Sequence, residues 1–141
     1  MSLGLEKLSG SCLCGAVSYS ISGDAQKFYH CHCKRCRKAT GTGHASNIIM
    51  MDVEQLEWHQ GEENLTWYKV PDAERFATNF CKTCGSLMPR PPGEAKFAVI
   101  PVGTMDHEPK IQPQARIFAD SKSQWSCTDN DLPEFDQYPT G

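Results

Sequence analysis

The chain has 141 residues, 39% of them hydrophobic, which is long enough for one domain with a buried core. Fourteen basic and seventeen acidic residues give a net charge of −3, and this balance indicates neither nucleic acid nor a membrane surface as a partner. No apolar run reaches the length of a membrane span, and the polar start lacks the apolar segment of a secretory signal. We therefore expect a cytoplasmic protein, in which eight cysteines hold metal more often than they form disulfides.

Short strand patterns follow one another along the chain, and no helical period is sustained. We expect a polar leader over residues 1–9, one domain over 10–133 and a tail over 134–141. Alternating or apolar runs predict strands at 16–21, 28–33, 45–51, 56–60, 65–70, 75–80, 97–102 and 114–119. The sequence thus predicts a mostly-β domain.

The connections are predicted from their turn residues. Residues 22–24 indicate a turn, residues 37–43 a turn or one short helical turn, and residues 52–55 a single helical turn capped by its aspartate. The aromatic-rich runs on either side of residues 61–64 predict a β-hairpin, because the loop between them contains glycine. Residues 89–93, rich in proline, predict a stiff surface loop.

Seven of the eight cysteines fall into three groups. These are Cys12-x-Cys14, Cys31-x-Cys33-x-x-Cys36 and Cys81-x-x-Cys84. Glycine follows the first and the last group, and it permits the left-handed turn that brings backbone amides close to a metal-bound sulfur. Together these two groups supply the four thiolates of a tetrahedral structural zinc site. Such a site, joining distant segments, would stabilise the fold by on the order of 10 kcal/mol.

The middle group has three thiols. In an extended segment Cys31 and Cys33 share a face, and a tight turn through Lys34 and Arg35 would return Cys36 toward them. Three ligands leave one corner of a tetrahedron open, as in catalytic zinc sites. The first pair of cysteines could instead join this group, but a five-plus-two partition would leave the last pair without metal. Four plus three is therefore favoured.

Other readings of the cysteines and histidines stay open. Free cysteines can pack as small hydrophobic residues, and this is what we expect of Cys127, which lies outside the three groups. His30 and His32 alternate with the thiols of the middle group, so they face away from the metal and are expected in the core or at its rim. His44 could reach the site, although no spacing supports it as a ligand.

Four cations surround the middle group: Lys34, Arg35, Arg37 and Lys38. Cations lower the pKa of nearby thiols and attract anionic ligands, so we expect these residues to bind substrate. The alternative is an ordinary solvated run of charges.

Three runs occur in the order Gly10-Ser11-Cys12-Leu13-Cys14-Gly15-Ala16-Val17, then Cys31-His32-Cys33-Lys34-Arg35-Cys36-Arg37 with Thr40-Gly41, then Phe80-Cys81-Lys82-Thr83-Cys84-Gly85-Ser86. A further run, Ser121-Lys122-Ser123-Gln124-Trp125, comes late in the chain. In these runs the sequence resembles the glutathione-dependent formaldehyde-activating enzyme family, which includes the centromere protein V domain. The resemblance extends from about Gly10 to Pro133.

The resemblance implies a β-tent fold of short antiparallel sheets, two zinc sites and a carbon–sulfur lyase-type activity. The reaction that names the family adds glutathione to formaldehyde and gives S-hydroxymethylglutathione. The implied ligands of the structural zinc are Cys12, Cys14, Cys81 and Cys84. The implied ligands of the second zinc, which keeps an open position, are Cys31, Cys33 and Cys36. His44 departs from the apolar or aromatic residue expected there in the family.

We therefore expect an enzyme that acts on a small thiol–aldehyde adduct, with the three middle cysteines as its catalytic residues. The expected partners are a thiol such as glutathione and an aldehyde, with no nucleic acid, no membrane and a possible homodimer. One alternative is a zinc-dependent module that binds a thiol or adduct without turnover. Another is a zinc-ribbon nucleic-acid adaptor, but that function requires a basic face and this chain is acidic.

Overall fold

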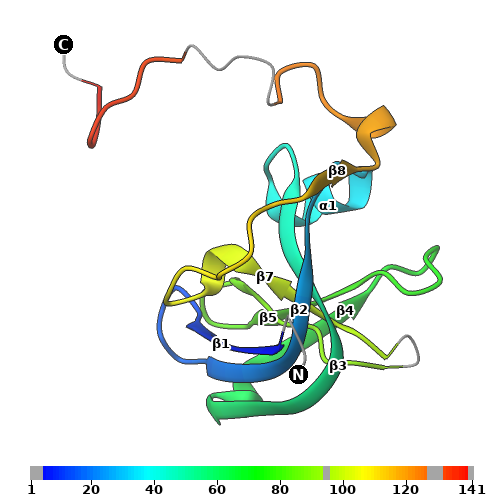
Figure 1. The fold of residues 1–141 in the computed structure, drawn as a ribbon, viewed down its shortest axis with the longest axis vertical. Helices are drawn as coiled ribbons and strands as arrows, with labels where there is room; N and C mark the ends of the chain where they lie inside the picture. The colour runs from blue at the N-terminus through cyan, green and yellow to red at the C-terminus, as the bar shows by residue number, and fades with distance from the viewer. Residues whose placement is uncertain (1–4, 94–95, 127–131, 140–141) are drawn as a thin grey trace.

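The computed structural model describes residues 5–93, 96–126 and 132–139 (Figure 1). The larger sheet contains β1 (Leu5–Ser11), β2 (Ser18–Cys31), β3 (Ala45–Gln60), β7 (Ala98–Pro101) and β8 (Ala115–Ile117). The smaller sheet contains β4 (Leu65–Lys69), β5 (Ala77–Cys81) and β6 (Leu87–Met88). Neighbouring strands are antiparallel except β2 and β8, which are parallel. The described chain is mostly β, as predicted.

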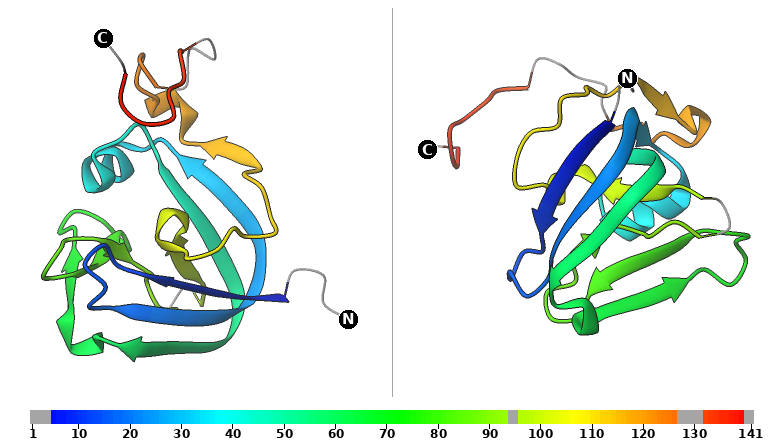
Figure 2. Two further views of the ribbon diagram at one scale, coloured as in Figure 1. Left: turned by 90° about the vertical axis from the view of Figure 1, so that its left-hand side faces the viewer. Right: turned by 60° about the horizontal axis from the view of Figure 1, so that its bottom comes forward.

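Two long strands, β2 and β3, run side by side through the molecule (Figure 2). The turn predicted at residues 22–24 is wrong, because β2 continues through it with register shifts between Ser22 and Lys27. The helical turn predicted at residues 52–55 is also wrong, because this segment lies within β3, where Asp52 adopts a φ of 48°. Turn-forming residues here mark a β-bulge, which bends a strand without reversing it.

The hairpin predicted across residues 61–64 is wrong as well. Residues 56–60 end β3 and pair with β2, whereas β4 pairs with β5 of the other sheet. The loop between them contains the short 3-10 helix η1 (Glu62–Asn64) and forms the corner between the two sheets. Residues 5–9, expected in a polar leader, instead belong to β1, where Leu8 is fully buried.

The remaining strand predictions agree with the structure more closely. The runs at 75–80, 97–102 and 114–119 correspond to β5, β7 and β8, and the 3-10 helices η2 (Val102–Thr104) and η3 (Ala119–Ser121) follow the latter two. Residues 132–139 extend away from the sheets (Figure 1). Within the described residues, no helix has the length and apolar character needed to cross a membrane.

The helix α1 (Lys34–Thr40) follows β2 and contains the run of cations. It begins directly after Cys33, whose Sγ accepts a hydrogen bond from the Cys36 amide and so caps the helix. Gly41 ends the helix in the left-handed conformation, with its amide donating to the Arg37 carbonyl. The predicted turn over residues 37–43 therefore begins earlier and is a seven-residue helix.

One core cluster includes side chains of both sheets. Its fully buried members include Tyr19, Ile48 and Ile100 of the larger sheet and Met88 of the smaller sheet. Burial of each large apolar side chain stabilises the fold by about 1.5–3 kcal/mol. Two thiols, Cys12 and Cys81, belong to the same cluster. The core is therefore in contact with two of the cysteines that are candidate metal ligands.

The corner between the sheets depends on Gly61. Its φ is 81°, and a Cβ at this position would lie 2.8 Å from the carbonyl carbon of Ala16 and still closer to its oxygen. The preceding residue, Gln60, donates from Nε2 to the Gly15 carbonyl at 2.7 Å. The corner is thus held against the loop that carries Cys12 and Cys14.

We expect Gly61→Ala to lower the free energy of unfolding by about 1–3 kcal/mol, because it combines an unfavourable φ with a steric clash. The measurement is urea unfolding followed by tryptophan fluorescence. Gly103→Ala is the matched control, since nothing lies within 4 Å of a Cβ there and its φ is not positive. Equal unfolding free energies for the two variants would contradict this role of Gly61.

Candidate metal centre

The fold brings together four cysteines from two distant segments. Cys12 and Cys14 lie in the loop between β1 and β2, whereas Cys81 ends β5 and Cys84 lies in the turn toward β6. All four Sγ atoms lie within 4.8 Å of one another. Cys14 Sγ is 3.7 Å from Cys12 Sγ and 3.8 Å from Cys81 Sγ, far beyond the length of a disulfide bond of about 2.0 Å.

These distances can be compared with a zinc–thiolate shell. With Zn–S bonds of about 2.3 Å, sulfurs at the corners of a tetrahedron lie about 3.8 Å apart. Two separations in the quartet Cys12, Cys14, Cys81 and Cys84 are close to this value, all the others are below 4.8 Å, and a set of four thiolates suits zinc. The quartet therefore fits a closed tetrahedral metal site.

Hydrogen-bond donors surround the sulfurs of the quartet. Asn64 Nδ2 donates to Cys81 Sγ at 3.2 Å, and the Ser86 hydroxyl lies 3.3 Å from Cys84 Sγ. The Ser86 hydroxyl and amide lower the pKa of Cys84 to about 5, which favours the thiolate form that binds metal. Such donors also orient metal ligands. Asn64 belongs to η1, so the corner next to Gly61 contributes directly to the site.

The two glycines after the cysteine pairs have the conformation that their position predicts. Gly15 and Gly85 have φ values of 83° and 81°, in the left-handed region. Their turns direct backbone amides to the cysteines: Gly85 donates to the Cys81 carbonyl at 2.7 Å, and Val17 donates to Cys12 Sγ at 3.2 Å.

The second group comprises Cys31, Cys33 and Cys36, here called the trio. Cys31 ends β2, Cys33 caps α1 and Cys36 lies in its first turn, so the expected turn through Lys34 and Arg35 is the start of a helix. The three Sγ atoms lie within 4.8 Å of one another. Among the residues described, no histidine, aspartate or glutamate joins them as a fourth ligand. Cys127 lies outside the described residues.

The surroundings of the sulfur atoms differ among the three cysteines of the trio. Burial raises the pKa of Cys31. Burial also acts to raise the pKa of Cys33, but the Cys36 amide at 3.3 Å and other donors outweigh it, so the pKa of Cys33 is lowered. The start of α1 thus favours a thiolate at Cys33. The trio fits three corners of a metal site, again with a donor set that suits zinc.

A cavity of about 510 Å³ lies against the trio. Its apolar walls include Tyr29, Ile49, Phe76, Phe97 and Phe118. A ligand bound at the trio would therefore contact mainly apolar groups.

The sequence analysis did not single out Arg90, which also lines this cavity. The backbone of Arg90 pairs with Val99 in both directions, and its guanidinium carbon lies 5.2 Å from the centre of the Phe76 ring. Burial lowers the pKa of Arg90, and charge on Cys36 and Cys31 opposes this shift. No carboxylate within the described ranges forms an ion pair with it. In the sequence, the only feature that distinguished Arg90 from other arginines was its position between two prolines.

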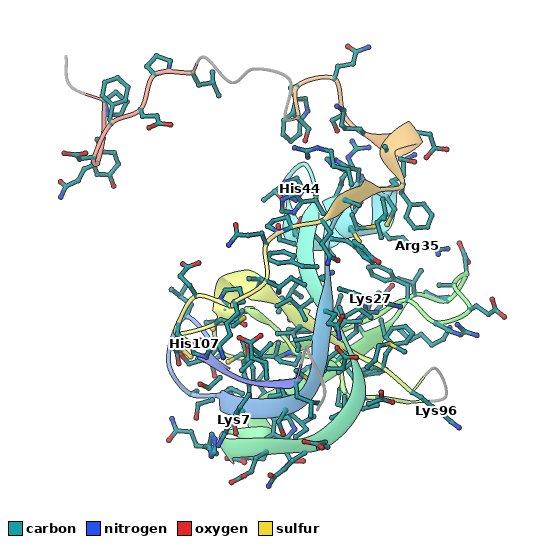
Figure 3. The ribbon with its side chains drawn as sticks, in the orientation of Figure 1. Lys7, Lys27, Arg35, His44, Lys96 and His107 are labelled. Atoms are coloured by element: carbon teal, nitrogen blue, oxygen red, sulfur yellow. The ribbon has the colours of Figure 1, made fainter. Side chains whose placement is uncertain are left out.

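The four cations predicted to bind substrate separate into two sets. Lys34 and Arg35 line the cavity beside the trio, and together with Lys38 they also line a second cavity of about 650 Å³. Arg37 lies elsewhere, because its Nη1 donates to the Ser121 carbonyl at 3.2 Å. In Figure 3, Arg35 and His44 lie on either side of α1.

The three histidines near the trio form a separate cluster. His32 is fully buried, with Nδ1 3.1 Å from the Gly43 carbonyl and Nε2 3.3 Å from Nη1 of Arg116. The ring of His44 lies 4.1 Å from that of His30 and 5.1 Å from that of His32. Burial lowers the pKa of His32 and of His30. As strand alternation predicts, these rings are not grouped with the thiols.

Comparison with known proteins gives a consistent result. A family model described as "Glutathione-dependent formaldehyde-activating enzyme" matches residues 7–121. A Halomonas elongata protein, named "Putative glutathione-dependent formaldehyde-activating enzyme", is 31% identical over 84 residues. The match covers 57% of this chain and 54% of that protein, so the chain spans about half the length of this curated relative.

A solved structure also resembles the fold. The crystal structure of a Rhodobacter sphaeroides protein, a structural genomics target, matches with a TM-score of 0.51 and 22% sequence identity. The match covers 77% of this chain and 98% of that chain. At this identity the similarity concerns the fold alone.

We expect Cys81→Ser to destabilise the protein far more than Cys36→Ser. Cys81 belongs to a quartet that joins two sheets, so its loss opens a site with a large contribution to folding, whereas the trio lies within one continuous segment. The measurement is thermal unfolding of zinc-loaded protein by circular dichroism, compared at equal protein concentration.

Metal analysis of the same samples provides the control. Two zinc ions per chain are expected for the native protein and one for Cys36→Ser, with retention of the metal at the quartet. Equal losses of melting temperature in Cys81→Ser and Cys36→Ser would contradict the four-plus-three partition.

Proposed function

This chain belongs to the glutathione-dependent formaldehyde-activating enzyme family, and from that premise we propose that it is a zinc-dependent, carbon–sulfur lyase-type enzyme that acts on a small thiol–aldehyde adduct. The proposed reaction is the reversible addition of a thiol such as glutathione to an aldehyde such as formaldehyde. The observation that supports it most directly is the trio of cysteines, without a fourth ligand among the described residues, beside a cavity of about 510 Å³ with mainly apolar walls.

The cysteines have separate proposed roles. The quartet would hold a structural zinc ion, and Cys31, Cys33 and Cys36 would hold a second ion next to the cavity. When bound, a zinc ion at the trio would supply a Lewis acid with an open position for a substrate thiol or carbonyl. The trio itself would fix that position at the start of α1, beside the cavity.

Charge determines which groups of the chain bind the substrate. A divalent ion with three thiolates carries a formal charge of −1, and a thiol such as glutathione brings additional carboxylates. Arg90 is half-buried beside the thiols, and its planar group can bind a carboxylate through two parallel hydrogen bonds. Lys34 and Arg35 add positive charge at the exposed side of the same cavity. We assign these three cations to substrate binding.

The stacked pair of Arg90 and Phe76 would orient the substrate. The ring restricts the guanidinium, so fewer conformations are lost when a carboxylate binds. The substrate would then be held between Arg90 and the trio, with its reacting carbon and sulfur close together. Such positioning contributes to rate because it converts a bimolecular step into an intramolecular one.

One observation favours a second candidate, a module that binds the adduct without turnover. No histidine, aspartate or glutamate lines the 510 Å³ cavity among the residues described. Thiol addition to an aldehyde requires proton movement, and these side chains most often provide it. A carrier would need only the metal position and the cations.

The reaction can be followed directly. We expect zinc-loaded protein to accelerate interconversion of glutathione, formaldehyde and their adduct above the spontaneous rate, measured by NMR exchange spectroscopy. Cys36→Ser should lose this acceleration, because it removes a proposed ligand of the second ion. Tight adduct binding in calorimetry without any acceleration would reject the enzyme and support the carrier.

The role of Arg90 gives a second test. Arg90→Met should raise KM for the thiol by about 10- to 100-fold and change kcat less, because a charge-assisted hydrogen bond contributes about 1.5–3 kcal/mol to binding. Arg90→Lys should recover part of the loss, since it restores charge without the planar fork. Lys82→Met, at an exposed position, is the control. An unchanged KM in Arg90→Met would remove Arg90 from the substrate site.

A further inference from the structure

The smaller sheet has one face in the core and one that no described sheet covers. Ala77, Cys81 and Met88 point into the core, as their near-complete burial shows. The alternate positions point the other way: Tyr68 pairs with Thr78, and Phe80 pairs with Leu87. Tyr68 retains 55% of its surface exposed, so this face presents apolar side chains to the outside.

A cavity of about 650 Å³ lies between this face and α1. Its volume is in the range that accommodates small organic ligands. Its larger apolar lining residues are Tyr68, Val70, Phe76, Phe80 and Leu87. Its charged lining consists of Lys34, Arg35 and Lys38, all exposed, and no acidic residue is among the described residues that line it. The cavity therefore combines an apolar floor with a positive rim.

This second cavity adjoins the cavity beside the trio. Lys34, Arg35 and Phe76 line both of them. A ligand could therefore place an anionic group at Lys34 and Arg35, close to the thiols, and extend an apolar chain across the face of the smaller sheet. Formaldehyde has no such chain, and glutathione has no long apolar chain, so neither molecule would cover the apolar part of this surface.

We propose that the cavity between α1 and the smaller sheet binds an amphipathic carboxylate, with its apolar chain on Tyr68, Phe80 and Leu87 and its carboxylate at Lys34, Arg35 and Lys38. Charge complementarity selects an anion, and the apolar floor selects a chain or ring. If the proposed function holds, on which this further step rests, the substrate class is a thiol–aldehyde adduct that carries an apolar group and a carboxylate. The binding site itself does not depend on turnover.

The experiment measures binding of octanoate to the zinc-loaded full-length chain by isothermal titration calorimetry. Acetate, which has the charge without the chain, and octylammonium, which has the chain with the opposite charge, are the comparison ligands. Octanoate is expected to bind at least 10-fold more tightly than either. Equal affinities for octanoate and acetate would overturn the proposal.

Variants locate the site. Lys38→Glu, at an exposed position of α1, should weaken octanoate binding by at least 5-fold, and Leu87→Glu should weaken it by at least 10-fold. Lys7→Glu is the matched control, because Lys7 is an exposed cation of β1, far from Arg35 in Figure 3, and should leave the affinity unchanged. Melting temperature and zinc content show whether each variant is folded. If Leu87→Glu does not fold, the result for Lys38→Glu decides the test.

Other occupants give different results. Residues 132–139 combine acidic and apolar side chains, so the same segment of a second copy is a rival ligand. Sedimentation analysis would then show a dimer that Leu87→Glu dissociates and octanoate does not, and the proposal would be wrong. If octanoate binds as expected but adduct exchange is not accelerated, the binding site is supported and the proposed function is rejected. If exchange is accelerated but octanoate does not bind, the proposed function is supported and the binding site is rejected.

Discussion

The junction at which four sulfurs lie within 4.8 Å of one another is the feature on which the rest of the structure depends. It brings the loop before β2 next to the end of β5, and a metal ion held there would tie the larger sheet to the smaller one. The corner at Gly61 serves the same junction, because it contacts Ala16 on one side and leads to Asn64, a donor to Cys81, on the other. With the two sheets fixed, the cavities between them and α1 acquire a defined shape. The trio of cysteines is then placed at the border of these cavities.

Helix α1 contributes both metal-ligand candidates and cations to the candidate site. Its start holds Cys33 and Cys36, and the same turn presents Lys34 and Arg35 to the solvent. The sulfurs of the trio and the positive charges of the helix therefore lie within one turn of each other. Arg90 adds a half-buried cation to the cavity beside the trio, and Phe76, which contacts Arg90, lines both larger cavities. This distribution supplies positive charge for the anionic substrate proposed above.

Local sequence patterns predicted which segments are strands better than they predicted where the chain reverses direction. Alternation placed His30 and His32 away from the thiols, and it identified most strands, because the two faces of a strand are an intrinsic property of its backbone. Signals for chain reversal were less reliable. Gly23 and Asp52 lie at bulges within long strands, since β2 and β3 pair with each other before and after these positions and so keep the chain extended. The run at 65–70 pairs with β5, whereas the run before the loop pairs with β2.

By itself, the sequence determined the β character of the chain, the seven grouped thiols and the family to which it belongs, because cysteine spacing and alternation are local properties. Only the tertiary structure decided that the outer pairs form one quartet, that Arg90 faces the trio, and that one sheet face forms a cavity with α1. These features depend on contacts between segments far apart in the chain. Their geometry is set by how the two sheets pack, which no single segment encodes.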